Sequence, residues 1–372
     1  MRAAMATNRT AVAVFGATGY TGRLIARALS DHGIPLLLAG RDASKLAALA
    51  AQVGASDTLV ASVADQASLD ALAQRARVLI NCVGPFVDLG EPVVRAAIAA
   101  GAHYVDTTGE QPFLHAMAVH DQWAKSQGVA VIPALAFEIA LSDCGASLAA
   151  AELDEVDAVV VTYVTRFHAS QGTKRTALRV LQSDGFAYTN GQWVSEAPGR
   201  RHVFVDLPRP VGTVAAVSFP SAEVMTIPRH VAAREVRTYL SVPTVAARLL
   251  SATAPLVAGL ARSPLNRLGT WALGDGTEGP DAETRRRDVF HIAVDARGRR
   301  RGKPAGQRLI IRGRDPYGLT AAICRQGAQL LLDGGGRAAG VLAPAMAFDA
   351  RRFLDGLQSE GVAYESLPLP VA

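Results

Sequence analysis

The amino-acid sequence predicts an α/β protein, in which a domain built on a parallel sheet precedes an α+β domain built on a mixed sheet. About 140 residues at the start alternate short apolar runs with amphipathic helical segments, which is typical of a parallel sheet. From about Asp154 onward, loops rather than helices separate the β-like runs. A length of 372 residues suits two domains, and 49% hydrophobic with 19% charged residues exclude a disordered chain.

The first domain is expected to contain six strands, each a short apolar run of the kind that a sheet covered on both faces requires. These strands are Ala11–Phe15, Pro35–Ala39, Thr58–Ser62, Val78–Val83, His103–Asp106 and Val129–Pro133. The segments between them show helical periodicity, and the expected helices are Gly22–Asp31, Asp42–Val53, Gln66–Gln74, Pro92–Ala100 and Gln111–Gln127.

The second domain is expected to contain longer β-runs and few helices. The β-runs are Val156–Thr165, Ala215–Phe219, Val289–Val294 and Arg308–Ile311, and the expected helix on this sheet is Lys174–Ser183. Two further helices are expected near the end of the chain, at Tyr317–Leu332 and Ala350–Gln358. We place the nucleotide-binding domain at residues 1–135, completed by residues 318–372, and the second domain at residues 136–317.

Composition excludes several classes of protein. Three cysteines without a Cys-x-x-Cys pair argue against a disulfide scaffold or a zinc site, and no metal is expected. The net charge of +5 is mild and the basic residues are mostly scattered, so nucleic acid is not an expected partner. No apolar signal-peptide core precedes Ala11, which favours a cytoplasmic location.

Residues 241–273 form an apolar segment with two interpretations. Arg248 is the one charge between Val242 and Leu260, but Pro243 and Pro255 interrupt the run. The segment either packs as a buried or interface helix pair, or meets lipid at the periphery of a membrane. A homodimer is also left open.

A glycine loop between the first strand and the first helix carries the clearest functional signal. It reads Gly16-Ala17-Thr18-Gly19-Tyr20-Thr21-Gly22. Gly16 permits a tight turn, Gly19 lets the backbone approach a pyrophosphate, and Gly22 allows the helix to pack closely on the strand. The anion would sit at the positive end of the helix. The loop therefore predicts a dinucleotide site.

The end of the second strand indicates which dinucleotide binds. An NAD site usually has an acidic residue there, whereas Arg41 follows the strand here, with Lys45 one turn further on. Asp42 is interpreted as a helix cap, and the sequence predicts NADP (as NADPH). Asp65 either contacts the adenine or caps the next helix. Val83, Gly84 and Pro85 follow the fourth strand and would form a wall beside the nicotinamide ribose, or else a plain loop.

Several stretches together resemble the saccharopine dehydrogenase-like family. They are the glycine loop, Ala39–Asp42, Asn81–Phe86, Gly101–Glu110, Phe137–Asp143, Gly172–Thr173, Asp315–Thr320 and Gly340–Ala345, the last two being similar to the branch of trans-acting enoyl reductases. The resemblance implies a Rossmann domain, a second α+β domain and reduced-nicotinamide chemistry. It also implies substrate contacts from Phe86, Phe137, Gly172 and Thr173. Arg166, at the end of a long β-run, either binds a carboxylate or phosphate of the substrate or is a solvated surface residue.

No single proton donor stands out in the sequence. No tyrosine has a lysine four residues later, which argues against a short-chain dehydrogenase. His103, Tyr104 and Glu110 are candidates near the carboxyl edge of the sheet, although His103 could be structural and Glu110 could cap the helix that follows it. The catalytic residue is left unknown.

Three functions are consistent with these observations. The first is an NADPH-dependent oxidoreductase that reduces a C=C bond of an apolar acyl substrate, either small or bound to a carrier. The second is a saccharopine reductase-type enzyme acting on the C=N bond of an amino acid. The third is a non-catalytic NADP-binding or lipid-surface protein. The basic run Arg297–Lys303 either docks an acidic carrier or protects a hairpin tip from edge pairing.

Overall fold

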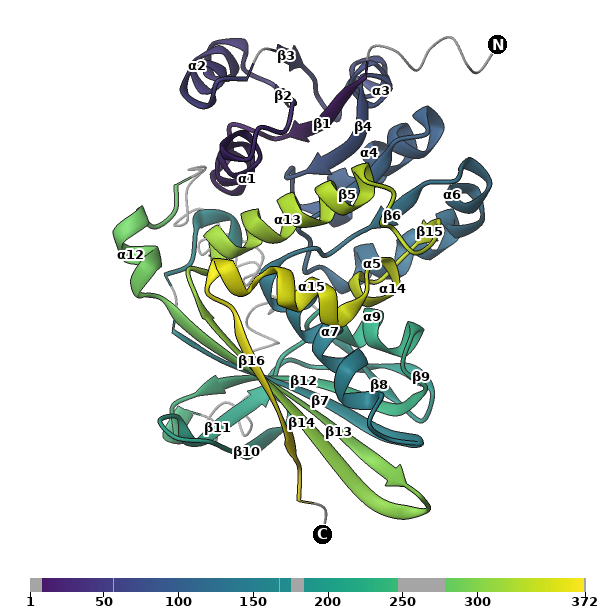
Figure 1. Ribbon diagram of the computed structural model, residues 1–372, viewed down its shortest axis with the longest axis vertical. Helices are drawn as coiled ribbons and strands as arrows, with labels where there is room; N and C mark the ends of the chain where they lie inside the picture. Colours follow the sequence, from purple (N-terminus) through teal and green to yellow (C-terminus); the bar gives the residue numbers. More distant parts are fainter. Residues whose placement is uncertain (1–8, 56, 167, 175–183, 247–277, 371–372) are drawn as a thin grey trace. The chain divides into compact units, whose positions relative to one another are not determined.

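The computed structural model divides the chain into two compact units (Figure 1). It describes all residues except 1–8, 56, 167, 175–183, 247–277 and 371–372. Unit 1 comprises residues 1–137 and 317–349, and unit 2 comprises residues 138–316 and 350–372. Each unit is described by itself below.

Unit 1 contains a sheet of seven parallel strands in the order β15-β6-β5-β4-β1-β2-β3. The strands are β1 (Thr10–Phe15), β2 (Leu36–Gly40), β3 (Asp57–Val60), β4 (Ala76–Asn81), β5 (His103–Asp106), β6 (Ala130–Ile132) and β15 (Gly340–Val341). Every residue of β2 is buried, as expected for a strand covered on both faces. The predicted parallel α/β domain is confirmed.

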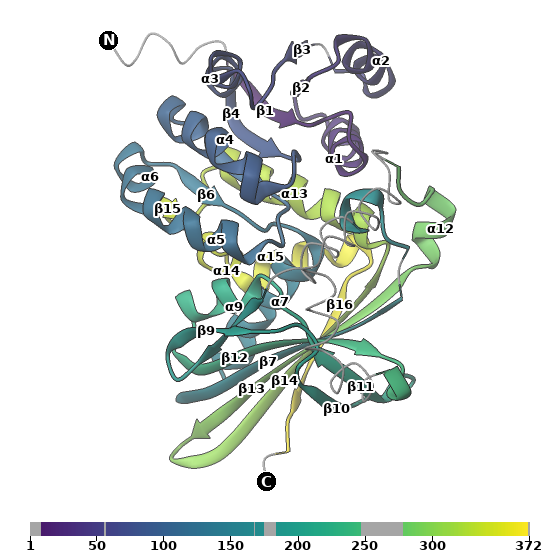
Figure 2. The same cartoon turned by 180° about the vertical axis from the view of Figure 1, so that it is seen from behind.

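The helices of unit 1 connect and cover these strands (Figure 2). They are α1 (Tyr20–Asp31), α2 (Ala43–Val53), α3 (Gln66–Gln74), α4 (Phe86–Ala100), α5 (Gln111–Met117), α6 (Asp121–Gln127), α13 (Pro316–Leu332) and α14 (Pro344–Ala347). Gly54, Gly101 and Gly128 end α2, α4 and α6 in the left-handed conformation that glycine adopts without strain. The predicted helix over residues 111–127 is divided by a 3-10 turn at Ala118–His120.

The strand order of unit 1 determines where a ligand can bind. The connection from β1 leads to β2 on one side, whereas β4 lies on the other side of β1. Open α/β sheets bind ligands outside the carboxyl ends of their strands, at the point where the strand order reverses. In this sheet that point lies between β1 and β4, beside the glycine loop.

Unit 2 is built on a mixed sheet in the order β10-β11-β12-β7-β13-β14-β16, with β8 and β9 beside it. Its strands are β7 (Glu155–Arg166), β8 (Gly185–Thr189), β9 (Gln192–Glu196), β10 (His202–Leu207), β11 (Gly212–Ser218), β12 (Ala233–Val242), β13 (Val289–Arg300), β14 (Lys303–Arg314) and β16 (Ala363–Pro368). Its helices are α7 (Phe137–Ala150), α9 (Glu223–Thr226), α12 (Ala282–Arg287) and α15 (Ala350–Gly356). The predicted mixed-sheet domain is confirmed.

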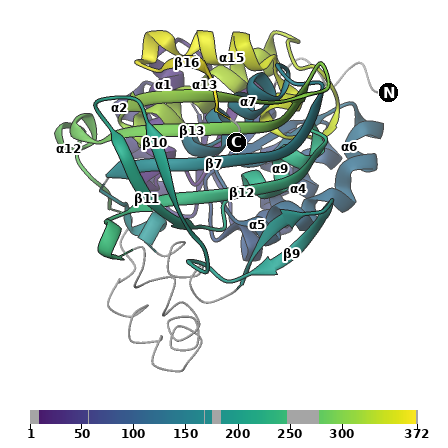
Figure 3. The ribbon, with the colours of Figure 1, turned by 90° about the horizontal axis from the view of Figure 1, so that it is seen from below.

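The sheet of unit 2 curls strongly. Val205 and Leu207 of β10 share an apolar cluster with Ala293 of β13 and Ile310 of β14. In the sheet order, however, β10 and β13 are separated by three other strands. Side chains from such distant strands meet because the sheet bends back over its own face, as Figure 3 shows. The sheet thereby buries part of one face against itself.

The basic run predicted at Arg297–Lys303 forms the end of the β13–β14 hairpin. Arg300 pairs with Lys303, so Arg301 and Gly302 alone make the turn. Their φ angles of 52° and 72° are those that a tight two-residue hairpin requires. Arg300 forms an ion pair with Glu152, at 3.4 Å. The other basic side chains of the tip, Arg299, Arg301 and Lys303, are exposed.

The last 23 residues of the chain belong to unit 2 and not to unit 1. Residues 318–372 were expected to complete the nucleotide-binding domain, but residues 350–372 belong to unit 2 because β16 pairs with β14. Most of segment 241–273 lies outside the described residues, so its two interpretations stay open. Within the part of the chain that the structure describes, no helix has both the length and the apolar character needed to cross a membrane.

Candidate functional site

The glycine loop of unit 1 has the backbone geometry that its sequence predicts. Gly16 has a φ of 78°, a conformation that other residues rarely adopt. A Cβ atom on Gly16 would lie 2.8 Å from Cγ2 of Val83, and one on Gly22 would overlap the carbonyl oxygen of Gly16. Larger residues at these two positions would push the loop away from β4 and from the start of α1.

The first turn of α1 is open to an anion. Gly19 occupies the N-cap position, and no side chain caps the helix. A Cβ atom on Gly19 would lie 3.2 Å from the carbonyl oxygen of Gly16, so even a small side chain here is tight. Arg23 bonds the carbonyl oxygen of Thr18 (3.1 Å) and holds the loop in shape. An uncapped helix start beside a glycine loop fits the pyrophosphate of a dinucleotide.

Arg41 stands at the carboxyl end of β2, where the cofactor's ribose substituent would be recognised. Its side chain is exposed, and no described residue forms a hydrogen bond or ion pair with it. Asp42 caps α2 by accepting a hydrogen bond from the backbone N–H of Lys45 (3.0 Å), and the Lys45 ammonium lies 3.7 Å from the same carboxylate. Arg41 is therefore available for a 2′-phosphate, whereas Asp42 already has a structural task.

Asp65 follows β3, and the segment Val83–Pro85 follows β4, so the two come from strands on opposite sides of β1 and β2 in the sheet. Asp65 caps α3 by accepting hydrogen bonds from the N–H groups of Ala67 (3.1 Å) and Ser68 (3.3 Å). The capping interpretation is confirmed, and the adenine contact stays a prediction. The N–H of Val83 donates to the Asn81 side chain (2.9 Å), which fixes the turn that follows β4.

A buried polar network anchors the carboxyl ends of β4 and β5. The Asn81 amide donates to the Tyr104 hydroxyl (3.1 Å), which donates to Asp106 (2.8 Å). Asp106 also accepts from the N–H groups of Thr108 and Ala134, both at 2.9 Å. Burial raises the pKa of Asp106 to about 7, although these hydrogen bonds oppose the rise. The network stabilises the loops that surround the cofactor region.

The three candidate proton donors of unit 1 all have structural partners. Tyr104 is fully buried within the network, and burial together with Asp106 raises its pKa well above 10. His103 begins β5, so it lies at the amino end of the strand and not near the carboxyl edge, which corrects its expected position. Its Nδ1 accepts from the Ala130 N–H (3.0 Å), and burial lowers its pKa.

Glu110 is a helix cap, but for a different helix than expected. It precedes α5, yet its carboxylate accepts hydrogen bonds from the N–H groups of Phe86 (2.9 Å) and Val87 (3.0 Å) at the start of α4. A carboxylate at this position compensates the positive end of α4. Because of this remote cap, α4 begins at Phe86 rather than at Pro92, where the sequence indicated its start.

The expected substrate residues belong to both units. In unit 1, Phe86 begins α4, and the N–H of Phe137 donates to the Thr320 hydroxyl (3.2 Å). In unit 2, Arg166 is the last residue of β7, while Gly172 and Thr173 lie in a helical turn that begins at residue 171. Whether they contact a substrate stays a prediction.

Unit 2 contains an Asp–His pair that the sequence did not reveal. Nδ1 of His168 lies 2.8 Å from Oδ1 of Asp288, and the backbone N–H of His168 donates to Oδ2 of the same residue (2.9 Å). The Asp288 side chain is buried, with 3% exposed, whereas the imidazole is 70% exposed. The two residues are 120 positions apart, so no local pattern could have predicted their pairing.

A second group of polar residues in unit 2 is fully buried. Oε1 of Glu223 lies 2.8 Å from the Ser142 hydroxyl, which also donates to the carbonyl oxygen of Glu138 (2.6 Å). A serine hydroxyl has one proton, so both contacts are complete hydrogen bonds only when Glu223 is protonated and donates to Ser142. Burial raises the pKa of Glu223 to about 8, in agreement with this arrangement.

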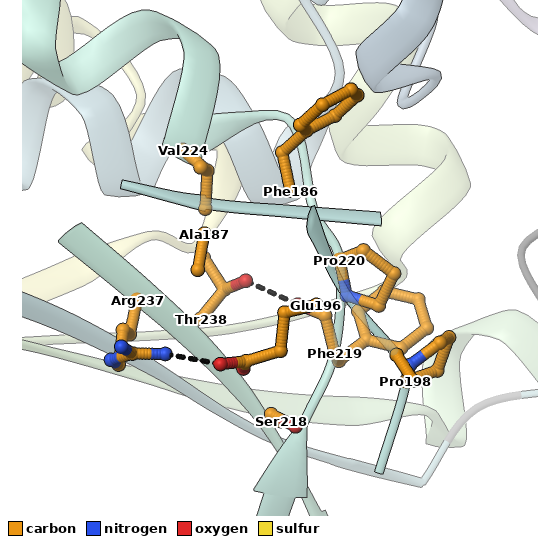
Figure 4. A pocket seen from close by; sticks show the side chains of 11 residues that line it. Phe186, Ala187, Glu196, Pro198, Ser218, Phe219, Pro220, Val224, Arg237 and Thr238 are labelled. Atoms are coloured by element: carbon orange, nitrogen blue, oxygen red, sulfur yellow. Dashed lines mark hydrogen bonds and ion pairs between the residues drawn. The ribbon is translucent and has the colours of Figure 1, made fainter. Parts of the chain in front are cut away.

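A small pocket in unit 2 proves to be structural (Figure 4). Arg237 lies in its wall and bonds Glu196 (2.6 Å) and Thr189 (3.0 Å), and Arg201 bonds the same Glu196 oxygen (3.0 Å). The interior measures about 10 Å³, which is at most the space of one water molecule. Its charges are already paired, so this pocket offers no cationic site for a substrate carboxylate.

Comparison with known proteins agrees with this geometry. Residues 12–132 match the model of the saccharopine dehydrogenase NADP binding domain. The chain is 29% identical to a human saccharopine dehydrogenase-like oxidoreductase over 43% of its length and 42% of the relative's. It is 32% identical to a trans-acting enoyl reductase from Mycobacterium ulcerans, over 48% and 46% of the two chains. The matched segments thus span less than half of these relatives.

Two further similarities extend the comparison. A lipid droplet localized protein of Caenorhabditis elegans is 34% identical over 37% of this chain and 35% of its own. The fold is similar to that of an apo saccharopine dehydrogenase (L-Glu forming) from Saccharomyces cerevisiae, with a TM-score of 0.65 at 13% identity, over 96% of this chain and 99% of that chain. Residues 12–132 therefore form a domain of the saccharopine dehydrogenase NADP-binding type, and the likeness of the whole chain to the solved saccharopine dehydrogenase is one of fold.

Proposed function

We propose that the protein is an NADPH-dependent reductase of a C=C bond in an apolar acyl substrate, either free or bound to a carrier. The observation that carries the proposal is the cofactor cradle of unit 1. It consists of an uncapped α1 start, a loop whose three glycines leave little room for a Cβ atom, and an exposed Arg41 that no described residue bonds. NADPH supplies a hydride when it is bound. The chain's own groups bind the phosphates, orient the ring and deliver a proton.

The acyl substrate is supported by the printed names of two relatives. One is named a trans-acting enoyl reductase and another a lipid droplet localized protein. Both names are consistent with apolar acyl chains, and neither implies an amino acid. Because these relatives match over less than half of their lengths, the substrate class is inferred and needs a direct assay.

The alternative is a C=N reductase of the saccharopine type. It is supported by the likeness to a solved saccharopine dehydrogenase, although 13% identity establishes only a common fold. An amino-acid substrate would need cationic groups free to bind its carboxylates. Arg201 and Arg237 do not meet that need, because both are bonded to Glu196. These two arginines are thereby removed as carboxylate ligands, and we favour the acyl substrate on the printed names of the relatives.

The test is a comparison of substrates with the full-length protein. NADPH oxidation is measured with soluble enoyl thioesters of increasing chain length and, in parallel, with imines formed from lysine-type amines and keto acids. We expect turnover of the thioesters, rising with chain length, and little with the imines. Turnover of imines alone would establish the alternative. NADPH binding without turnover of either class would indicate a non-catalytic NADP-binding or lipid-surface protein.

A further inference from the structure

The turn after β4 is held at both of its ends by side-chain oxygens of unit 1. We call its three residues, Val83–Pro85, the wall segment. The first N–H of the wall segment donates to Oδ1 of Asn81 (2.9 Å). Directly after the segment, the half-buried carboxylate of Glu110 accepts the N–H groups of Phe86 (2.9 Å) and Val87 (3.0 Å). The wall segment therefore has a fixed anchor on each side.

One chain of hydrogen bonds connects the two anchors. The Asn81 amide donates to the Tyr104 hydroxyl, which donates to Asp106. Asp106 accepts the N–H of Thr108, whose hydroxyl accepts the N–H of Glu110 (3.1 Å). The chain thus leads from one end of the wall segment, through the carboxyl end of β5, to the other end. It restrains the backbone of Glu110 and thereby the place from which its carboxylate reaches α4.

The wall segment borders the glycine loop. A Cβ atom on Gly16 would lie 2.8 Å from Cγ2 of Val83. Just before the segment, the N–H of Cys82 donates to the carbonyl oxygen of Phe15, the last residue of β1 (2.8 Å). Both contacts lie between β1 and β4, where the strand order reverses and open α/β sheets bind their ligands. A displacement of the wall segment would therefore change one side of the cofactor cradle.

The order of the strands indicates which half of the cofactor faces the wall segment. Arg41 follows β2, which lies on one side of β1, so a 2′-phosphate at Arg41 places the adenosine half on that side. The pyrophosphate fits the start of α1, directly after β1 and the glycine loop. A dinucleotide spans the crevice between the two halves of such a sheet. The nicotinamide half then extends toward β4, on the side of the wall segment.

Glu110 has no local substitute. Pro85 occupies the N-cap position of α4, and no side chain caps the helix from there. Without Glu110, the N–H groups of the first turn lose their acceptor and the positive end of α4 loses its compensating charge. The body of α4 has a separate anchor, since the Phe113 ring packs on Phe86 (ring centroids 5.9 Å apart) and leaves no room for a Cβ atom on Gly90. We therefore expect the loss of Glu110 to loosen the wall segment and to leave the fold intact.

We propose that Glu110 is a positioning residue for the nicotinamide half of NADPH, which it serves by holding the wall segment in place. Each oxygen of its carboxylate already accepts a backbone N–H, so Glu110 acts through the main chain. The inference rests on the cofactor-binding part of the proposed function and is independent of the substrate. When only a fraction of the molecules has a binding site in the competent arrangement, the apparent affinity falls by that fraction. Loss of Glu110 should therefore weaken ligands that reach the wall segment and spare ligands that do not.

The test compares two ligands that share the 2′-phosphate. NADPH has both halves, whereas adenosine 2′,5′-bisphosphate has the adenosine half without the nicotinamide. In calorimetry with the full chain, Glu110→Ala should bind NADPH about tenfold more weakly or worse, as expected when charge-assisted hydrogen bonds are lost, and should bind the bisphosphate unchanged. Glu110→Gln should lose less affinity for NADPH, because its amide oxygen still accepts one N–H.

The fluorescence of the reduced nicotinamide gives a second readout. At saturating NADPH, its emission lifetime reports how firmly the nicotinamide ring is held. We expect a shorter lifetime for NADPH bound to Glu110→Ala than for NADPH bound to the wild type, with Glu110→Gln between them. A residue that only stabilises the fold would leave the lifetime of the bound cofactor unchanged.

Two further variants are controls. Asp121 also reaches a distant backbone N–H, that of Val341 (3.0 Å), but it does so at β15, the outer strand of the sheet. Asp121→Ala should therefore leave the affinity for both ligands unchanged. Arg41→Ala should weaken both ligands, because both carry the 2′-phosphate.

The outcomes separate this inference from the proposed function. If the wild type binds NADPH and Glu110→Ala binds it equally well, or loses both ligands to the same extent, the positioning role is wrong and the proposed function stands. If circular dichroism shows that Glu110→Ala does not fold, the same comparison with Glu110→Gln decides. If the wild type binds neither ligand, the cofactor-binding part of the proposed function fails and the role of Glu110 falls with it.

Discussion

Replacing the buried Glu223 by glutamine should change how the stability of unit 2 depends on pH. Glu223 is fully buried, and its pKa rises from 4.5 to about 8, chiefly because burial disfavours the charged form. Ser142 lies 2.8 Å from one of its oxygens, and the neighbouring carboxylates of Glu138 and Asp143 oppose its ionisation further. The structure therefore favours a neutral acid at physiological pH.

The direction of this pH dependence follows from the number of protons bound in the folded and the unfolded state. Between pH 4.5 and about 8 the unfolded chain has released this proton while the folded unit retains it, so rising pH favours unfolding. This rise in the pKa of Glu223 corresponds to about 5 kcal/mol of folding free energy. The contribution is fully lost once the pH exceeds about 8. In Glu223→Gln the amide donates to Ser142 at every pH, so this loss should be absent. Relative to the wild type, the variant should become more stable as the pH rises.

The assay is urea unfolding at a series of pH values from about 5 to 9, with hydrogen exchange of peptides from α9 and β7 reporting on unit 2. The quantity of interest is the difference in free energy of unfolding between Glu223→Gln and the wild type. We expect this difference to grow by several kcal/mol across the series. Glu152→Gln, which removes an exposed carboxylate of the same unit, is the control. Parallel curves for the wild type and Glu223→Gln would refute a buried neutral acid.

Three further predictions concern the proposed function. Arg41→Ala should weaken NADPH binding by about tenfold or more, because a charge-assisted bond to phosphate contributes about 1.5–3 kcal/mol, and should leave NADH binding unchanged; an unaltered ratio of the two affinities in calorimetry would exclude Arg41 from 2′-phosphate recognition. Gly19→Val should abolish NADPH binding while circular dichroism shows the fold intact, because a Cβ here already lies 3.2 Å from a carbonyl oxygen; retained binding would disprove the loop assignment. Serine at Arg299, Arg300 and Arg301 should slow turnover of a carrier-bound enoyl substrate at low salt and spare a soluble thioester. Equal rates on the carrier-bound substrate would make the hairpin tip an ordinary surface.

Local sequence patterns were sufficient for the nucleotide-binding half of the molecule. The glycine loop lies where its spacing indicates, and Gly16 has the positive φ that the turn requires. Asp42 and Asp65 cap the helices that they precede, since a capping bond reaches only two or three residues along the chain. Alternating strands and helices identified the parallel sheet, because each element must bury an apolar face of a characteristic period.

Contacts between distant residues could not be predicted in this way. Glu110 caps α4 from 24 residues away and moves the start of that helix to Phe86. Residues 350–372 join unit 2 because β16 completes the edge beside β14, a pairing that hydrophobic pattern alone does not specify.

The exposed Asp–His pair of unit 2 shows the same division. The sequence places His168 just after a long β-run and gives no reason to prefer it over the other seven histidines. Tertiary structure brings Asp288 to its ring from 120 positions away, buries the carboxylate and leaves the imidazole exposed. Local patterns determine helices, turns and caps because those depend on bonds between near neighbours. The chemistry of a side chain depends on its burial and on the charge that faces it, and both are decided only when distant strands pack together.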